Sequence, residues 1–270
     1  MRKQQYTFAL LFAFLAIPAF CQNRSGDLKF PAQLDISKDI PLHFKRFYDQ
    51  PGHFDFLTDK FYPIGWSKDG KFAYFEEQAD EACGCYFGAF IIQDLKTDKI
   101  LWEHRHIGDE IGAERDEAVV IGEERKQLWA SKNAEFKSKL KQYGIQPAES
   151  FSRQTGPIKT EADEIILSID LTRTDADPLI GFPYNLVRIV GKAVSAKKGE
   201  KVIFEEKLKG NDTLYGINGV IDAQIFGHLL SPFESRAAVI LVEVVRGYEG
   251  PPHTIRTSVR GVSLTSGFKK

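Results

Sequence analysis

The chain of 270 residues has one methionine, three cysteines and no excess of basic residues. Its formal net charge is −1 at pH 7, which argues against a nucleic-acid-binding protein, because such proteins carry a basic surface. No phosphate-binding glycine loop, nucleophile elbow or zinc-protease helix motif occurs. These absences exclude the enzyme classes that such motifs mark and predict no cofactor, but they leave open a hydrolase with an unfamiliar site.

Long apolar runs are also scarce. The run at residues 8–17 follows a basic start and is too short to cross a bilayer, which is typical of the core of a signal peptide. Ala19 and Cys21 suit cleavage after residue 21, so residues 1–21 are predicted to be a signal peptide and the mature chain to be exported, either periplasmic or secreted. A lipid anchor on Cys21 is disfavoured, because Phe20 stands where a small residue is normally required. No later run predicts a transmembrane segment.

Aromatic residues are abundant, with 21 Phe, 9 Tyr and 3 Trp. They favour a β-rich core, because aromatic side chains pack well on pleated surfaces. Residues 22–58 mix charge, proline and aromatics without a period and are predicted to be an irregular lead-in that adds at most one strand. The remaining length suits one large domain, which we expect over residues 59–268.

A strand, a polar turn and a second strand are predicted over residues 62–77, with the turn at Ser67–Gly70. Two more strands, at 86–93 and 99–106, flank a turn at 94–98. Further strands are expected at 164–171, 186–194, 202–208, 237–245 and 254–264. The pattern predicts a mainly β fold of antiparallel, blade-like or meander units, forming a partial propeller or a sandwich-like structure. Buried positions are expected at Trp66, Phe72, Tyr74, Ile91, Trp102, Val239 and Leu241.

One helix is predicted, around residues 122–143 within an insertion at 110–150. Trp129, Phe136 and Leu140 recur on one face of it, and Gly144 follows as a stop. A charged helix with a narrow apolar stripe usually packs on the flank of a domain, and a partner-binding helix is the alternative.

The opening turn, the helix ending before Gly144 and the late segment 231–251 resemble an uncharacterised bacterial family of predicted secreted proteins. That family carries a Ser-Pro-Asp-Gly turn in a similar opening, whereas Lys68 takes the place of the proline here. The resemblance implies export and a mainly β fold, and it implies no catalytic residue.

Two groups of polar residues are candidates for a site. The carboxylates Glu76, Glu77, Asp80 and Glu81 are predicted to form a solvated acidic loop, rather than an acid/base pair or a calcium site. The segment containing Tyr248, Glu249 and His253 is a candidate binding loop. A sharp turn that its prolines hold in shape is favoured over binding for that segment.

The sharpest chemical prediction concerns Cys83 and Cys85. If Asp94 pairs with Lys99 and the register continues, Cys85 lies opposite Gly108, and Cys83, Cys85, His104 and His106 share one face. These four side chains are a candidate zinc or copper site. A disulfide between the two cysteines is favoured over this site and over free thiols, because exported proteins meet an oxidising environment.

The sequence therefore predicts an exported, non-enzymatic module of the cell envelope that binds an unknown envelope protein or a small ligand. The alternatives are a hydrolase with an unrecognised site and a metal or redox protein that uses Cys83 and Cys85.

Overall fold

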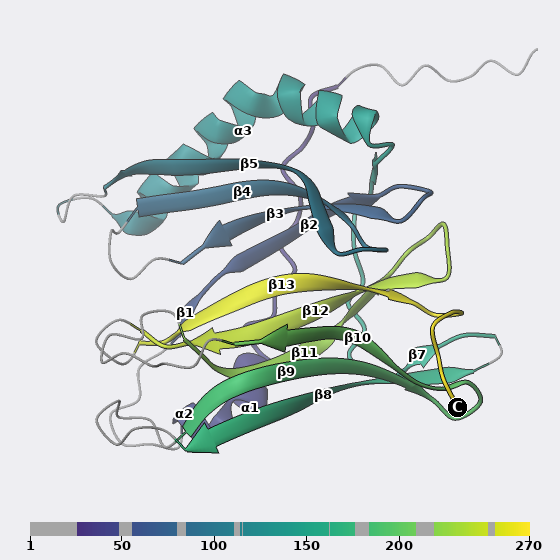
Figure 1. The fold of residues 1–270 in the computed structure, drawn as a ribbon. Coiled ribbons are helices and arrows are strands. Elements are labelled where there is room, and N and C mark those ends of the chain that lie inside the picture. Colours follow the sequence, from purple (N-terminus) through teal and green to yellow (C-terminus); the bar gives the residue numbers. More distant parts are fainter. Residues whose placement is uncertain are drawn as a thin grey trace, which may run out of the picture.

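Alternating apolar and polar residues build most of the chain into strands, which a computed structural model places in three sheets (Figure 1). The structure describes residues 26–48, 56–79, 85–110, 114, 116–161, 163–175, 184–208, 219–247 and 252–270.

Sheet B is formed by strands between residues 60 and 147. It contains β2 (Lys60–Trp66), β3 (Lys71–Gln78), β4 (Cys85–Asp94), β5 (Lys99–Glu110) and β6 (Gln146–Pro147), in the order β5-β4-β3-β2-β6. Neighbouring strands are antiparallel. In the turn between β2 and β3, the Lys71 backbone N–H donates to the Ser67 hydroxyl at 2.7 Å, and Gly70 adopts φ of 91°. The predicted turn is therefore confirmed.

Helix α3 (Glu117–Gln142) covers the outer face of sheet B. The Asp116 side chain caps its start by accepting from the N–H groups of Ala118 and Val119, and Gly144 follows its end with φ of 68°. The helix begins before the predicted residue 122 because this capping residue lies upstream of the apolar stripe. Phe136 stacks on Phe90 of β4 with ring centroids 4.4 Å apart.

Apart from the short strand β1, sheets A and C are formed by the second half of the chain. Sheet A contains β1 (Leu57–Thr58), β13 (Thr254–Ser263), β12 (Arg236–Val245) and β11 (Val220–Leu230), in that order. Sheet C contains β10 (Gly199–Lys207), β9 (Tyr184–Ser195), β8 (Glu164–Asp175) and β7 (Ile158–Lys159). The pairing of β1 with β13 is parallel, and the remaining pairs of neighbouring strands in both sheets are antiparallel.

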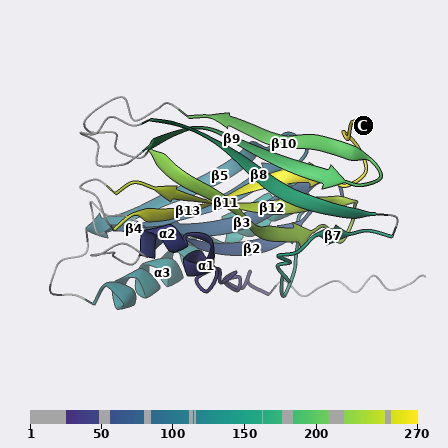
Figure 2. The same ribbon diagram turned by 90° about the horizontal axis from the view of Figure 1, so that it is seen from below.

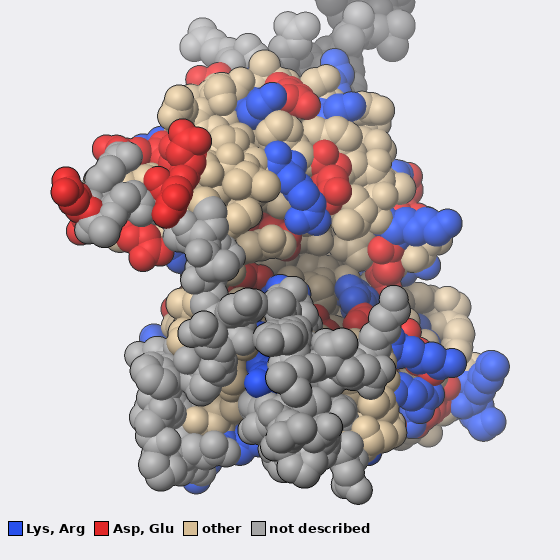
Figure 3. All heavy atoms as spheres, turned by 60° about the vertical axis from the view of Figure 1, so that its left-hand side comes forward, with Lys and Arg blue, Asp and Glu red and all other residues tan. Residues whose placement is uncertain are grey.

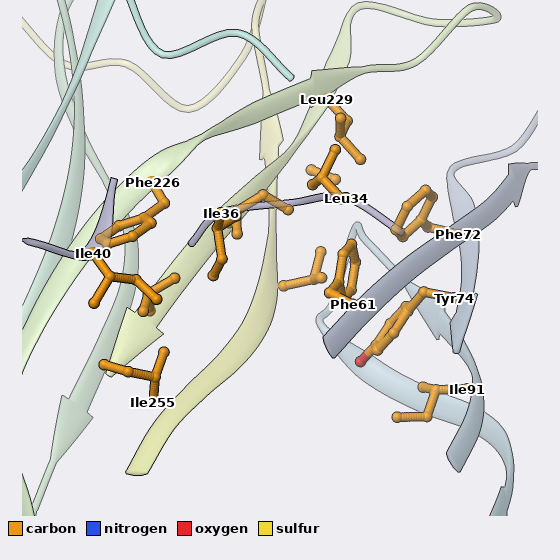
Figure 4. Packing of buried hydrophobic residues seen from close by; sticks show 14 of the residues in the cluster. Leu34, Ile36, Ile40, Phe61, Phe72, Tyr74, Ile91, Phe226, Leu229 and Ile255 are labelled. Atoms are coloured by element: carbon orange, nitrogen blue, oxygen red, sulfur yellow. The ribbon is translucent and has the colours of Figure 1, made fainter. Parts of the chain in front are cut away.

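The elements stack as layers, in the order α3, sheet B, sheet A and sheet C (Figure 1). The curved sheets form two half-barrels. The largest apolar cluster lies between sheets B and A, where Phe72, Tyr74 and Ile91 meet residues such as Phe226 and Ile255 (Figure 4). The mainly β, antiparallel fold with one inserted helix is confirmed, in its sandwich-like form.

Sheet B approaches sheet A very closely at the turn between β4 and β5. A methyl group on Gly261 of β13 would lie 2.6 Å from the carbonyl carbon and 2.7 Å from the Cα of Leu95. The Gly261 N–H donates to the Asp98 carboxylate at 2.7 Å, and the Gln93 amide donates to the Val259 carbonyl at 3.0 Å. Only glycine has the space for this contact.

The segment that precedes sheet B is more ordered than predicted. Its Leu28 carbonyl accepts from the Trp129 indole at 2.6 Å and from the Asn133 amide at 2.7 Å, which fastens it to α3. Two short helices follow, α1 (Ile40–His43) and α2 (Lys45–Tyr48), on one side of sheet A (Figure 2). Phe44 stacks there against Phe226 of β11. Strand β1 is the one strand that the lead-in was expected to add.

The predicted core is buried at all of its positions but one. Trp102 is only half-buried, because β5 is the edge strand of sheet B. No helix in the described part of the chain is long and apolar enough to cross a membrane.

Candidate functional site

The two ends of the layered structure differ in their connections. Four-residue turns join β2 to β3 and β4 to β5 at one end, which we call the turn end. At the other end, which we call the loop end, the chain leaves the sheets for longer segments at 79–84, 176–183, 208–219 and 246–253. Paired strand ends from all three sheets meet there, as in the pairs Gln78 with Phe87, Asp175 with Tyr184, and Val245 with Thr254. Buried ionisable groups gather near these strand ends.

Two carboxylates, Glu76 and Asp59, lie near each other between sheets B and A. Burial raises the pKa of Glu76 to about 7, and the Asp59 charge raises it further. Burial also raises the pKa of Asp59 to about 6, although the backbone N–H groups of Ala79 and Thr257 lower it. The Gln78 amide donates to Glu76 at 2.8 Å. The pair can therefore hold a proton near neutral pH.

Glu77, the neighbour of Glu76, points to the other face of sheet B and serves α3. It accepts hydrogen bonds from the hydroxyls of Tyr62 at 2.8 Å and Tyr86 at 3.0 Å, and the Arg125 Nε binds it at 2.5 Å. Burial and the Glu77 charge raise the pKa of both tyrosines, so their hydroxyls remain donors. All of these contacts are internal, and the ion pair between Glu77 and Arg125 holds α3 against the sheet.

Two further clusters of ionisable groups lie at sheets A and C, one around Glu243 and one around Asp222. Burial raises the pKa of Glu243 on β12 to about 7, and the Glu206 charge raises it further, while Arg260 and Arg256 lower it. Arg260 also binds Glu206 across the gap between sheets A and C. Asp222, at the start of β11, binds Arg46 of α2 at 2.8 Å and Arg173 of β8 at 3.3 Å. These contacts tie the strand ends of sheets A and C together.

The surface of the loop end is strongly charged in places (Figure 3). Exposed acidic residues gather where β5 ends and α3 begins, at Asp109, Glu110, Glu114, Asp116 and Glu117. At mid-height in the same view, between the upper and lower parts of the molecule, the surface is indented, and charged atoms of both signs appear there.

The prediction of a solvated acidic loop is wrong for two of its four residues. Glu76 and Glu77 are only 7% and 5% exposed, because both belong to β3, whose two faces are covered by sheet A and by α3. Asp80 and Glu81 lie outside the described residues. The aromatic neighbours Tyr74 and Phe75, which alternate in step with the two glutamates, were the available indication of burial.

The register of β4 and β5 departs from the predicted one beyond the turn. Asp94 pairs with Lys99 as predicted, but bulges place Cys85 opposite Glu110 rather than Gly108. His104 and His106 face α3, where the His104 ring packs 5.7 Å from Phe136 and the His106 Nε2 lies 3.4 Å from Glu124.

Cys85 alternates with Tyr86, whose side chain is on that same helix side, so strand alternation directs Cys85 to the other face. The predicted site of Cys83, Cys85, His104 and His106 depended on a register that the structure does not have. The described residues contain no cluster of three or more metal-ligating side chains. Cys83 lies outside the described residues, so its disulfide with Cys85 stays a prediction.

The candidate binding loop is described only at its end. His253 is buried, its Nδ1 accepts from the Gly247 N–H at 3.3 Å, and burial together with Arg246 lowers its pKa to about 4. Its ring packs against Phe47 at 5.7 Å. His253 therefore anchors the base of the segment, whereas Tyr248 and Glu249 lie outside the described residues.

Comparison with known proteins adds no assignment: no protein-family model, no curated protein and no solved structure matches the chain. Sequence reasoning missed Asp59, Glu206 and Asp222, because an isolated acidic residue on a strand gives no local indication that distant strands will enclose it.

Proposed function

We propose that this chain is an exported, non-enzymatic module of the cell envelope that binds a protein or a small ligand at its loop end. The observation that carries the proposal is the difference between the two ends of the sheets. Tight turns close one end, while at the other end the strand ends of three sheets lead into longer segments. Loops that a rigid scaffold holds together are the usual place for recognition.

The charged contacts at the loop end support the same proposal. Asp222 joins α2, β8 and β11, and Arg260 joins sheet A to sheet C, so the bases of the connecting segments are held by partners from different layers. A binding surface gains affinity from such a fixed base, because less ordering remains to be done when the partner arrives.

The proposal is tested by capture from the native envelope with three forms of the mature protein. One is unchanged, one has residues 211–217 replaced by a Gly/Ser linker, and the control has Lys197 and Lys198 replaced by serine in the turn between β9 and β10. Mass spectrometry identifies what each form retains. A partner held by the unchanged and control forms and lost by the loop variant supports the proposal. Capture that is equal for the loop variant contradicts it, as does repeated failure of capture together with turnover in a substrate screen.

A hydrolase is the second candidate, because Glu76 and Asp59 form a carboxylate pair whose pKa values lie near neutrality. Glycoside and ester substrates test it directly. Activity that Glu76→Gln abolishes while Glu103→Gln leaves it unchanged would favour the hydrolase over the binding module.

A further inference from the structure

The edges of the sheets are sealed in most places by side chains or short segments. Such sealing matters because an open strand edge presents unpaired N–H and C=O groups to other chains. The edge of β13 beyond β1 receives the Gln93 amide on the Val259 carbonyl and the Asp98 carboxylate on the Gly261 N–H.

The other outer strands are capped in similar ways. On β11, Arg153 donates to the Phe226 carbonyl at 2.6 Å, and His228 exchanges two backbone hydrogen bonds with Gln154. On β10, Glu200 exchanges two backbone hydrogen bonds with Lys269 of the C-terminal segment. Strand β2 is paired by β6 and by the Leu34 N–H, and β8 has β7 and β11 beside it.

Strand β5 is different. Within the part of the chain that the structure describes, its outer edge receives one cap, from the Tyr143 hydroxyl to the Leu101 carbonyl at 3.1 Å. That contact shows that the Leu101 carbonyl points away from β4. The bulge at Leu101 interrupts this alternation, but the pairing with β4 is regular from Trp102 to Ile107, so the backbone N–H and C=O groups of every second residue in this stretch point to the open edge. The stretch contains Glu103 and Arg105. The side chains of these two residues are 39% and 51% exposed.

The sequence of this edge is complementary to itself. In an antiparallel pair centred on His104, Glu103 lies opposite Arg105 of the second copy, and Arg105 opposite Glu103. In the same register Ile107, which is 66% exposed, lies at the end of the regular stretch and opposite the bulge at Leu101. Opposite charges and apolar pairs that face each other across strands stabilise a sheet, whereas like charges destabilise it. We propose that β5 pairs with β5 of a second copy in this register, which joins the two B sheets into one.

The position of α3 leaves room for this pairing. The backbone of the helix lies nearest to β4, one strand in from the edge, where Phe136 stacks on Phe90. Its Phe136 and Glu124 side chains also reach the histidines of β5. A twofold axis perpendicular to the sheet places both helices on the same side, with the two β4 strands three spacings, or roughly 14 Å, apart. Helices in contact lie about 8–10 Å apart, so the two helices do not overlap.

The paired segment is short, because bulges interrupt β5 on both sides of its central residues. A contact of this length buries less than the ~1,200 Å² of a standard interface, so we expect a weak dimer in rapid exchange with monomer. Sedimentation velocity of the mature protein over a wide concentration series measures this equilibrium.

Charge reversal tests the register. Glu103→Arg alone and Arg105→Glu alone each create two like-charged contacts across the axis and should weaken association about tenfold, which corresponds to ~1.4 kcal/mol. An equimolar mixture of the two variants should associate again, because each then meets the opposite charge, and the double variant should behave like the unchanged protein. Arg188→Glu, in the exposed pair with Glu205 of sheet C, is the matched control and should change nothing.

The outcomes distinguish this pairing from a contact elsewhere on the molecule. Recovery in the mixture cannot come from the ion pair within one chain, because neither single variant retains that pair. A protein that stays monomeric throughout the concentration series overturns the proposal. The alternative is then that a strand from another protein pairs with the outer edge of β5. A dimer that is insensitive to both single variants, or equally sensitive to the control, also overturns it, because the two copies then meet through different residues.

Discussion

Replacing Gly261 with alanine tests how sheets B and A fit together. Its methyl group would lie 2.6 Å from the Leu95 carbonyl carbon, about 1 Å inside the ordinary contact distance between carbon atoms. The Leu95 atoms that the methyl group would meet belong to the backbone and cannot rotate away, so the two sheets must separate locally. Overpacking of this kind costs about 1–3 kcal/mol. Separation also strains the hydrogen bonds from Gly261 to Asp98 and from Gln93 to Val259, which adds about 1–3 kcal/mol.

Urea unfolding of the mature protein measures the expected loss of about 2–6 kcal/mol in the free energy of unfolding. Gly122→Ala is the matched control, because that glycine lies inside α3 with open space around it, and it should gain roughly 0.5–1 kcal/mol. A double-mutant cycle with Gln93→Ala adds a second check: Gln93→Ala should cost less when Gly261→Ala has already separated the sheets. A Gly261→Ala protein as stable as the unchanged one would refute the close contact.

Three further changes test other contacts. Leu241→Ala should lower the free energy of unfolding by about 2–5 kcal/mol, because Leu241 is fully buried between sheets A and C, and a loss near zero would contradict that packing. Glu77→Gln should cost about 2–4 kcal/mol in the same assay, because Arg125 loses its buried partner, while Glu124→Gln at the partly exposed pair with His106 should cost far less. Glu76→Gln should change how the free energy of unfolding depends on pH. Native Glu76 keeps its proton up to about pH 7, whereas the unfolded chain releases it near pH 4.5. The stability that the protonated group contributes is therefore lost as the pH rises from 4.5 to 7. The wild-type minus variant difference should fall between these pH values, and a flat difference would contradict the raised pKa.

The sequence predicted the local part of the fold well. Hairpins were indicated by their turn residues, as at Ser67–Gly70 and between Asp94 and Lys99, because a turn and its flanking strands interact over a few residues. The helix was found from its apolar stripe, although its true start depended on the capping side chain of Asp116.

What the sequence could not show was the stacking of the sheets. Whether Glu76 is solvated depends on sheet A, whose three long strands, β11, β12 and β13, lie more than 140 residues further along the chain. The bulges in β5 decided which face carries His104 and His106, and no residue pattern specified them. Of the candidate site, the sequence marked His253 as a binding residue but did not indicate that its ring would be buried, and the partners of Asp59 and Asp222 required the assembled layers.

The parallel pairing of β1 with β13 has a consequence for the order of folding. Leu57 pairs with Thr254, and Thr58 with Ile255, so sheet A joins the early part of the chain to nearly its last segment. During synthesis the hairpins of sheet B and helix α3 are complete long before β13 emerges. Until then, the face of sheet B carrying Phe72 and Ile91 lacks the part of its cover that β13 supplies through Ile255 and Val259. Contacts so distant in sequence form slowly. We therefore expect the chain to keep part of this apolar face exposed until its last strand is made, and a chaperone has most to bind during that period.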